Sequence, residues 1–483
     1  MATYIGPKGY SILKERLSIT EQESIRNDLK VTPFIPKSSM AKPSPFPIYR
    51  ESKNKFYVPR FYGMKTYGDP KYIKINTGNP VQLQFNGTLR EHQIPAVQKY
   101  LACAKKKGCG LLELYCGAGK TVCTLKIIAD LGVKTLIIVH KTFLMNQWEE
   151  RIREFLPTAR VGKIQAEIID IGNKDIVLGM LQSLSMKEYP LTLFQSFGLT
   201  VIDEVHHISA EVFSRALFKV VTPYMLGLSA TMKRKDGLTK VFKMFLGDIV
   251  YKKAREGTDK VLVKAIHYEH NDAKYKKEHY NFRGHINYAI MIKQLCEFQP
   301  RTDFIIQCIQ DTLKENSDQQ IMVLGHNKSI LTYMHNCIKK LNFATVGYYI
   351  GGMKERDLKI SESKQIIIAT YKMAEEGLDI KTLTTLIMVT PKTDVCQAVG
   401  RILRKKLKEH LIMDIIDQHP VFKRQWIKRR RYYKKQNYTI METELNNYHK
   451  GEWKITYQKG SKDIKKKVKH KLQTGQCLID DDD

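Results

Sequence analysis

A glycine-rich turn followed by Lys120 and Thr121 carries the clearest prediction of chemistry in the sequence. It lies in residues 111–121, LLELYCGAGKT, where an apolar run typical of a buried strand gives way to the turn. Glycines let backbone N–H groups close on an anion at the start of a helix. The Lys120 ammonium can then reach the outer phosphates of a triphosphate, and the Thr121 hydroxyl can hold Mg²⁺. Leu114 stands where the strict motif has glycine, but the context of strand, turn and helix still predicts a phosphate-binding loop. The residues of the turn are Cys116, Gly117, Ala118 and Gly119.

A pair of carboxylates, Asp203 and Glu204, predicts the second part of the same site. The pair ends the apolar run 199–204, LTVIDE, and ligands of open parallel sheets bind at the carboxyl ends of strands. Asp203 there can hold Mg²⁺ through water, and Glu204 can polarise the water that attacks the terminal phosphate. Such a pair is common by itself. Together with Lys120 and Thr121 it makes hydrolysis of ATP the leading interpretation.

Two arginines, Arg401 and Arg404, resemble those of the helicase motif Q-x-x-G-R-x-x-R, and this resemblance makes them candidates for the opposite side of that site. They lie in residues 397–404, QAVGRILR, and residues three apart on a helix face the same way. From across a cleft they can clamp the terminal phosphate and stabilise charge in the transition state, as an arginine finger does.

The elements that must position these residues form two sets of short apolar runs that alternate with helical patterns. This alternation predicts an α/β fold with two tandem domains, each built on a parallel sheet. The helical patterns at 121–130 and 143–156 belong to the first domain. The expected strands of the first domain are 110–115, 135–140, 175–180, 199–204 and 224–230, and those of the second are 321–326, 346–351, 365–370, 384–390 and 410–416.

Three further regions complete the expected organisation. Residues 1–88 form an N-terminal accessory region, with a helix at 19–29 that Thr20 caps with Glu23 as its capping-box partner. The aromatic and basic residues at 49–62 either stack on nucleic-acid bases or pack a small domain. Residues 253–300 are expected to be a linker, and 426–483 a basic tail that is either a solvated charge run or a nucleic-acid contact.

Composition restricts the class of protein and of partner. Hydrophobic residues make up 43% and charged residues 27% of the sequence, as in ordinary globular proteins. The 80 Lys and Arg against 49 Asp and Glu leave a net charge of +31, which favours nucleic acid over a membrane as partner. The nine cysteines show no C-x-x-C or zinc-type spacing. We therefore expect reduced cysteines in a soluble intracellular protein of the cytoplasm or nucleus, with no signal peptide or membrane span.

The order of the motifs resembles that of a DExH helicase of superfamily two. The acidic pair continues as DEVHH (203–207), and Ser229-Ala230-Thr231 ends the next expected strand. This combination, with the phosphate loop of 114–121, resembles the XPB and UvsW group. The compact plan, with MLQSLS at 180–185 and YYIGGM at 348–353, resembles helicases encoded by large DNA viruses.

The resemblance implies roles for further residues and boundaries for the domains. It implies RecA-like domains at 89–252 and 301–425, and a small thumb-like element within 253–300. Gln93 would read adenine and Asp379 would contact the ribose. The residues that would couple the phosphate site to nucleic acid and to the second domain are His206, Ser229, Thr231, Gly377 and Gln397.

We therefore expect an ATP-dependent helicase or translocase that uses ATP and Mg²⁺, with DNA favoured over RNA. Its setting would be transcription or repair, with a virion as a further location if it is viral, and the resemblance implies 3′-to-5′ movement. Residues 234–236 read Arg-Lys-Asp where XPB has Arg-Glu-Asp, which keeps open a duplex translocase that does not separate strands. An RNA helicase, a basic scaffold with an inactive nucleotide site and the motor of a restriction system stay open as well. Nothing in the sequence predicts the oligomeric state.

Overall fold

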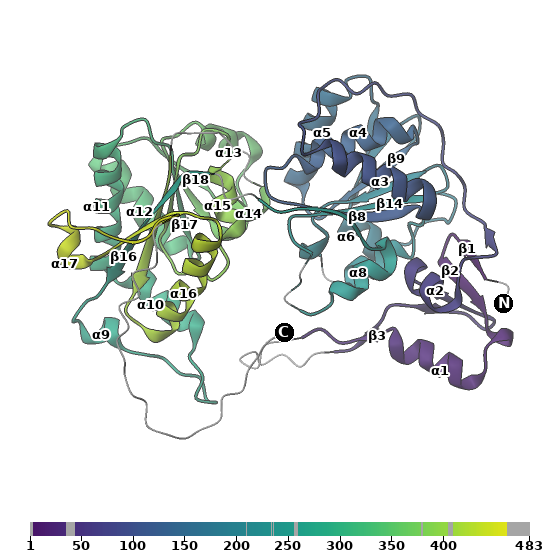
Figure 1. The fold of residues 1–483 in the computed structure, drawn as a ribbon, viewed down its shortest axis with the longest axis horizontal. Coiled ribbons are helices and arrows are strands. Elements are labelled where there is room, and N and C mark those ends of the chain that lie inside the picture. The colour runs from purple at the N-terminus through teal and green to yellow at the C-terminus, as the bar shows by residue number, and fades with distance from the viewer. Residues whose placement is uncertain are drawn as a thin grey trace.

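The structure is a computed structural model, shown in Figure 1. It describes residues 3–34, 44–208, 210–232, 234, 236–255, 259–377, 380–403 and 409–460. Two large α/β lobes lie next to each other, and a small N-terminal sheet packs beside the first lobe (Figure 1). Within the described residues, no helix is both long enough and apolar enough to cross a bilayer.

The first lobe contains an eight-stranded sheet in the order β11-β10-β12-β9-β13-β14-β8-β15, and every pairing except that of β10 with β11 is parallel. Its central strands are buried along their whole length because helices cover both faces of the sheet. The strands are β8 (Cys109–Leu114), β9 (Thr135–Val139), β10 (Val161–Gln165), β11 (Ile168–Asp170), β12 (Ile176–Met180), β13 (Leu199–Ile202), β14 (Tyr224–Ser229) and β15 (Ile249–Lys253).

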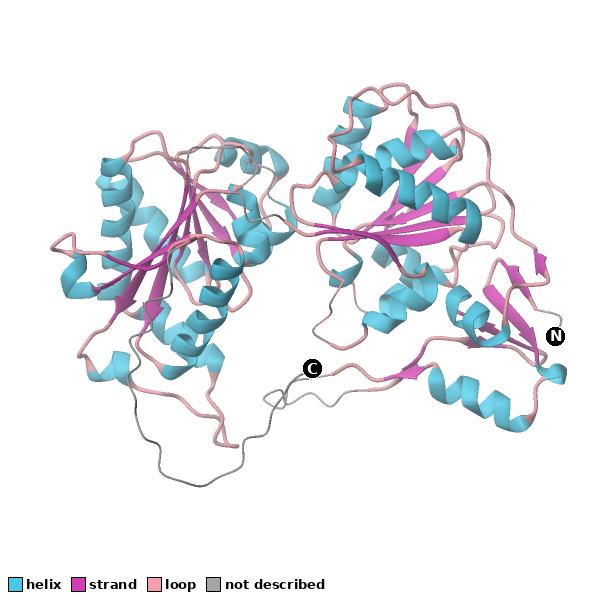
Figure 2. Cartoon of the chain, viewed as in Figure 1, coloured by secondary structure: helices cyan, strands magenta, loops and turns pink. Residues whose placement is uncertain are grey.

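Helices of the first lobe form two layers, one on each side of this sheet (Figure 2). The side chains of α3 (Ile94–Lys107), α4 (Lys120–Leu131) and α5 (Thr142–Phe155) share one apolar core. Those of α7 (Ala210–Leu217) and α8 (Thr239–Leu246) belong to the other core, which continues into the N-terminal region. The short α6 (Leu181–Met186) also joins this second core.

The second lobe repeats the plan with the strand order β18-β19-β17-β20-β21-β16-β22-β23, in which only the pairing of β22 with β23 is antiparallel. Its strands are β16 (Val261–Tyr268), β17 (Ile321–Gly325), β18 (Val346–Tyr349), β19 (Ile366–Thr370), β20 (Thr385–Met388), β21 (His410–Asp417), β22 (Thr439–Glu444) and β23 (Lys454–Tyr457). Its helices are α9 (Ala273–Lys276), α10 (Tyr288–Glu297), α11 (Gln299–Glu315), α12 (Lys328–Leu341), α13 (Glu355–Glu362), α14 (Tyr371–Gly377), α15 (Cys396–Ile402), α16 (Pro420–Lys435) and α17 (Leu445–Tyr448). The predicted α/β class with two tandem parallel sheets is confirmed.

Two segments differ from the prediction because they belong to the second sheet. Residues 261–268, expected in a linker, form β16 between β21 and β22. The expected basic tail supplies β22 and β23, and most of α16. Helix α16 looks polar in sequence, yet Arg429 is 1% exposed because its guanidinium donates to both oxygens of Asp414, at 2.7 and 2.9 Å. Because its buried side includes an arginine paired with an aspartate, the side of α16 that faces the core is not recognisable from hydrophobicity in the sequence.

The N-terminal sheet has the strand order β5-β6-β2-β1-β7 and packs one face against α1 (Ile19–Asp28) and α2 (Arg60–Tyr67). Helix α1 is capped by Ser18 with Glu21 as its partner, so the predicted cap at Thr20 is wrong. Among the aromatic and basic residues of 49–62, Phe56, Arg60 and Tyr62 are buried in this small domain. The strands are β1 (Tyr4–Gly6), β2 (Gly9–Leu13), β5 (Arg50–Glu51), β6 (Lys55–Val58) and β7 (Tyr72–Ile73), and a separate pair is formed by β3 (Lys30–Val31) and β4 (Phe46–Pro47).

Candidate active site

The predicted phosphate loop lies between the buried strand β8 and helix α4, which begins at Lys120. Gly117 (φ 88°) and Gly119 (φ 86°) both adopt the left-handed conformation that side chains disfavour. A Cβ added to Gly119 would lie 2.1 Å from Gln93 Nε2, whereas one added to Gly117 would meet nothing within 4 Å. The Gln93 side chain therefore fills the space beside Gly119, whereas the space beside Gly117 is open.

Gln93 holds the phosphate loop from outside. Its side chain is 3% exposed, accepts a hydrogen bond from Arg90 N at 2.9 Å and donates to Ala118 O at 2.9 Å. The His92 ring nitrogen lies 3.1 Å from the same carbonyl. Helix α3 begins at Ile94, just after Gln93. The start of α3 thus fixes the loop through one buried amide.

Lys120 and Glu204 form the centre of the candidate site. The Lys120 ammonium lies 2.9 Å from Glu204 Oε1, and both side chains are largely buried. Burial alone would lower the pKa of Lys120, but the charge of Glu204 outweighs it and raises that pKa. Glu204 has φ 48°, a left-handed conformation that is uncommon for glutamate and concentrates at functional sites.

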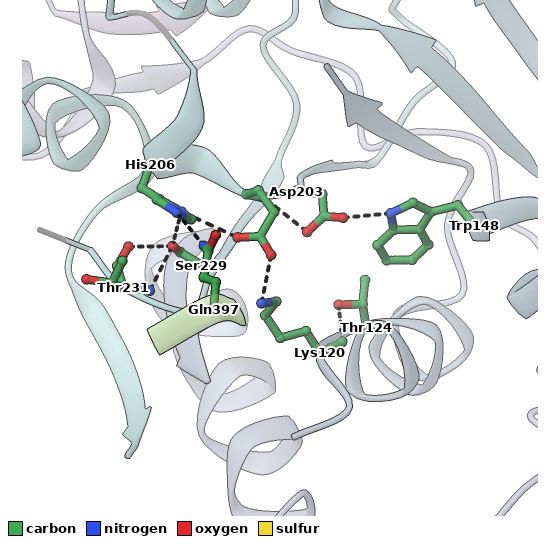
Figure 3. A network of polar contacts seen from close by, with 9 residues as sticks. Lys120, Thr124, Trp148, Asp203, His206, Ser229, Thr231 and Gln397 are labelled. Atoms are coloured by element: carbon green, nitrogen blue, oxygen red, sulfur yellow. Dashed lines mark hydrogen bonds and ion pairs between the residues drawn. The ribbon is translucent and has the colours of Figure 1, made fainter. Parts of the chain in front are cut away.

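Asp203 is held by two donors at the end of β13. The Trp148 indole Nε1 donates to Oδ2 at 2.9 Å (Figure 3), and the Glu204 backbone N–H donates to Oδ1 at 2.9 Å. Burial, together with the neighbouring Glu204 carboxylate, raises the pKa of Asp203 to about 6 against the opposing effect of Lys120. Trp148 falls within the helical pattern predicted at 143–156, and no motif in the sequence assigns it a role in the site. The polar edge of its indole, which usually finds a partner when buried, was the missed signal.

A chain of polar contacts runs from Glu204 through His206 into the second lobe, and Figure 3 shows its part from His206 to Gln397. His206 Nδ1 lies 3.4 Å from Glu204 Oε2 and 2.7 Å from Ser229 Oγ. Ser229 Oγ donates to Thr231 O at 2.5 Å and accepts from Thr231 N at 3.1 Å. On its other side, His206 Nε2 lies 3.2 Å from Gln397 Nε2 of α15. Four of the five predicted coupling residues are therefore in one network that reaches both lobes.

Helix α15 of the second lobe packs directly on the phosphate loop. A Cβ added to Gly400 would lie 2.9 Å from Cys116 Cβ, so only glycine permits this approach. Arg255, in the segment that joins the lobes, donates to Leu403 O at 2.8 Å and to Cys116 O at 3.5 Å. No pattern in the sequence singles out Arg255, because its role depends on where two distant elements meet.

Thr121 and Arg401 lie on the two helices that frame the site. Thr121 is the second residue of α4, and Arg401 follows Gly400 in α15. Gly377 is the last residue of α14. Arg404 and Asp379 lie outside the described residues.

Comparisons with known proteins agree with this geometry. Residues 86–234 match the family model described as the res subunit of type III restriction enzymes, and residues 303–406 match the helicase conserved C-terminal domain. The candidate ATP-dependent RNA helicase L396 of Acanthamoeba polyphaga mimivirus is 36% identical over 448 residues, which cover 90% of this chain and 85% of that protein. The chain belongs to the superfamily 2 helicases. It is accordingly an ATP-dependent helicase or translocase, and an ATPase.

Other relatives of this helicase are named for different activities. The candidate helicase 161L of Invertebrate iridescent virus 6 is 24% identical over 89% of this chain and 99% of its own. The DNA 3′-5′ translocase XPB2 of Sulfurisphaera tokodaii is 27% identical over 68% of this chain and 81% of its own. Among solved structures, T4 UvsW aligns with a TM-score of 0.36 at 18% identity, over 92% of this chain and 100% of that one.

Proposed function

We propose that this helicase binds ATP with Mg²⁺ between its lobes and uses hydrolysis to move along DNA. The contact between Gly400 and Cys116 carries the proposal, because it brings the helix of Arg401 against the phosphate loop of the other lobe. A site completed from two lobes ties turnover to lobe closure. Arg401, with Arg404, would then stabilise charge on the terminal phosphate.

The residues of the first lobe fit ATP and Mg²⁺. The open side of Gly117 leaves room for an anion at the start of α4. Mg²⁺ commonly uses one or two carboxylates together with substrate phosphates, so Thr121 and Asp203 would hold it here, and it would neutralise charge on the phosphates.

The ion pair of Lys120 and Glu204 suggests how binding prepares hydrolysis. At 2.9 Å the two charges neutralise each other, which stabilises them in a largely buried place. We propose that ATP phosphates draw the Lys120 ammonium away. Glu204 is then released to orient and polarise the attacking water. His206, 3.4 Å from Glu204, would report that change through Ser229 and Gln397.

DNA is the proposed track because the phosphate loop and DEVHH resemble the XPB and UvsW group, and because a relative is named as a DNA translocase. The net charge of +31 supports binding to a polyanion through its phosphates. Movement from 3′ to 5′, and work alongside transcription or repair machinery, belong to the same proposal. The alternative track is RNA, which the name of the mimivirus relative favours.

A second candidate, translocation on duplex without strand separation, is favoured by the contacts of Arg234. This arginine stands in the element that XPB has as Arg-Glu-Asp. Its guanidinium pairs with Asp236 and donates to the carbonyls of His206 and Ile208. An arginine engaged in this way supports the protein's own loops rather than a nucleic-acid strand.

Lys120→Ala tests the proposal. We expect ATP turnover to be abolished, while the affinity for nucleic acid is kept, because only the contact with the outer phosphates is lost. Turnover of the wild type is compared with single-stranded, duplex and forked DNA and with RNA as stimulators. Strand displacement is measured beside triplex displacement. Persistent turnover in Lys120→Ala would reject the site, and triplex displacement without strand displacement would select the second candidate.

A further inference from the structure

The outer face of the N-terminal sheet carries a row of aromatic and polar side chains, in which Ser11 is 1% exposed and Arg50 lies over the Phe218 ring of the first lobe, 5.6 Å from its centre. The register places Tyr72, Tyr4, Ser11, Tyr57 and Arg50 opposite one another across all five strands. Directly paired residues of neighbouring strands point to the same face. With strands about 4.8 Å apart, the tyrosines of β7, β1 and β6 span about 14 Å.

The other face of the same sheet accounts for the packing of this small domain. Side chains that alternate with the row are 0–1% exposed and contact the helices of the domain. They are Ile5, Tyr10, Ile12, Phe56 and Val58. The tyrosines of the outer row are therefore not needed to build this core, and Tyr72 is 50% exposed.

Lysines surround the tyrosines of the outer row. Lys8 Nζ lies 5.3 Å from the centre of the Tyr57 ring, and Lys55 and Lys74 lie 5.4 and 5.0 Å from that of Tyr4. Lys55 Nζ also donates to the Tyr4 hydroxyl at 3.1 Å. None of these three lysines pairs with an acid among the described residues. The face thus joins flat aromatic rings with cations whose charge no carboxylate neutralises.

We infer that this outer face binds a single-stranded stretch of nucleic acid, with bases stacked on the tyrosines and phosphates beside the lysines. Aromatic platforms combined with a cationic surface bind single strands with little regard to sequence, because every base has a π-face. Duplex fits less well, because its paired bases are not free to stack on rings. A cation above an exposed ring is held weakly, so a phosphate can draw it aside while the ring accepts a base.

The position of the N-terminal sheet determines how this binding face would relate to the proposed motor. The sheet lies on the side of the first lobe away from the second lobe (Figure 1). It is therefore separate from the contact between α15 and the phosphate loop, where turnover is proposed to occur. The inference rests on the proposed function only in taking nucleic acid as the substrate. The outer face would be a second binding site for a single strand, before the strand enters the motor or after it leaves.

The test uses the full chain with Tyr4, Tyr57 and Tyr72 all changed to Ala, or all changed to Phe. Phenylalanine keeps the stacking surface and removes only the hydroxyls. The matched controls are Phe282→Ala, an aromatic that is 74% exposed on the second lobe, and Lys314→Glu. Affinity is measured by fluorescence anisotropy with labelled oligothymidylate, oligouridylate and a short duplex at one salt concentration. We expect the alanine variant to lose at least about tenfold in single-strand affinity, and the phenylalanine variant to stay close to wild type.

Two further measurements keep the outcome clear. Photo-crosslinking of a bromouracil oligonucleotide to the wild-type chain should label these tyrosines, which does not depend on how any variant folds. ATP turnover at saturating nucleic acid should be unchanged in the alanine variant. Unchanged single-strand affinity, a loss restricted to duplex, or crosslinks only elsewhere would overturn the inference while leaving the ATPase proposal intact. If the wild type showed no ATP turnover but the alanine variant still lost single-strand affinity, the motor proposal would be rejected and the inference about this face would stand. The comparison of oligothymidylate with oligouridylate separates DNA from RNA.

Discussion

The proposed chemistry of this helicase depends on Glu204, whose backbone conformation is unusual. Its φ of 48° costs about 1–2 kcal/mol relative to an ordinary conformation, which the surrounding contacts must offset. One oxygen meets Lys120 and the other faces His206, at 2.9 and 3.4 Å. Because the same carboxylate contacts Lys120 and His206, we expect a change at either residue to alter the contact that Glu204 makes with the other.

Gly119→Ala and Gly117→Ala form a matched pair at the phosphate loop. Both change a left-handed glycine, so each costs about 1–2 kcal/mol of backbone strain. Only the new Cβ at 119 meets Gln93 Nε2, at 2.1 Å, and displacing that amide breaks its hydrogen bonds to Arg90 and Ala118. We expect the KM for ATP to rise about tenfold more in Gly119→Ala than in Gly117→Ala. Steady-state kinetics checks this, and equal effects would contradict the role of Gln93.

Trp148→Phe removes one donor from the buried Asp203 and keeps most of the ring. A buried carboxylate oxygen that loses its partner costs about 1–3 kcal/mol. We expect a lower thermal midpoint, and turnover at least about fivefold slower because the carboxylate is less well oriented. Calorimetry and ATPase rates at several Mg²⁺ concentrations measure both. Trp453→Phe, in the second lobe, is the control. If both variants turned over ATP like wild type, the indole would have no positioning role.

At the scale of elements, the segment from α16 to β23 shows why a basic sequence need not be a tail. Trp426, Arg429 and Tyr433 recur along one side of α16 and are 5%, 1% and 0% exposed. Strand β22 then pairs in parallel with β16. The charges that give the segment its basic composition lie on the opposite side of the helix, as in any amphipathic surface helix.

Glu442→Gln tests the integration of β22. Burial alone would raise the pKa of Glu442, but hydrogen bonds from His267 and Thr456, with the charge of Arg430, lower it from its usual 4.5 to about 2. A depressed carboxyl pKa stabilises the fold above pH 4.5, and this stability is lost as the pH falls through 4.5 toward 2.

We expect Glu442→Gln to cost about 2 kcal/mol near neutral pH and progressively less below pH 4.5. Denaturant titrations at several pH values, followed by tryptophan fluorescence, measure the difference between the variant and wild type. Glu315→Gln is the control, because that glutamate is 59% exposed beside Lys264. A cost that does not depend on pH would show that the charge of Glu442 is not what stabilises the strand.

For the whole molecule, defined side-chain contacts join the two lobes, as they do in the candidate site. Lys359 reaches Glu150 at 2.9 Å and Asn146 reaches Glu355 at 2.6 Å, both across exposed surface. Exposed pairs of this kind contribute little energy, so they permit opening and closing. The buried contacts near Arg255 instead tie the connecting segment to the phosphate loop and to α15 at once.

Arg255→Ala should uncouple the lobes without unfolding either. The guanidinium stacks over Tyr115 with 5.4 Å to the ring centre, and pairs with Asp259 at 2.6 Å. We expect stimulated turnover to fall about tenfold, because α15 is no longer tied to the loop. Arg255→Lys should recover only part of it, since lysine cannot make the forked contact. The exposed Arg283→Ala serves as the control. Wild-type turnover in Arg255→Ala would show that the tie has no part in closure.

The sequence by itself determined the two parallel sheets, the phosphate loop and the acidic pair. These features are local: apolar runs, a glycine turn before Lys120, and carboxylates at a strand end are fixed by residues close together in the chain. The helicase family was identified in the sequence by the resemblance of its motifs, and of their order, to those of superfamily 2.

Tertiary structure alone decided the partners of those residues. Trp148 donates to Asp203, which is 55 positions away, and Gly400 lies on Cys116, which is 284 positions away. Arg255 joins both lobes through residues that are 139 and 148 positions away. Local sequence propensity does not predict contacts between residues so far apart in the chain. The same reason explains why the segment with Arg429 was predicted as a tail: a buried cation looks like a surface one until its carboxylate, from another strand, is seen beside it.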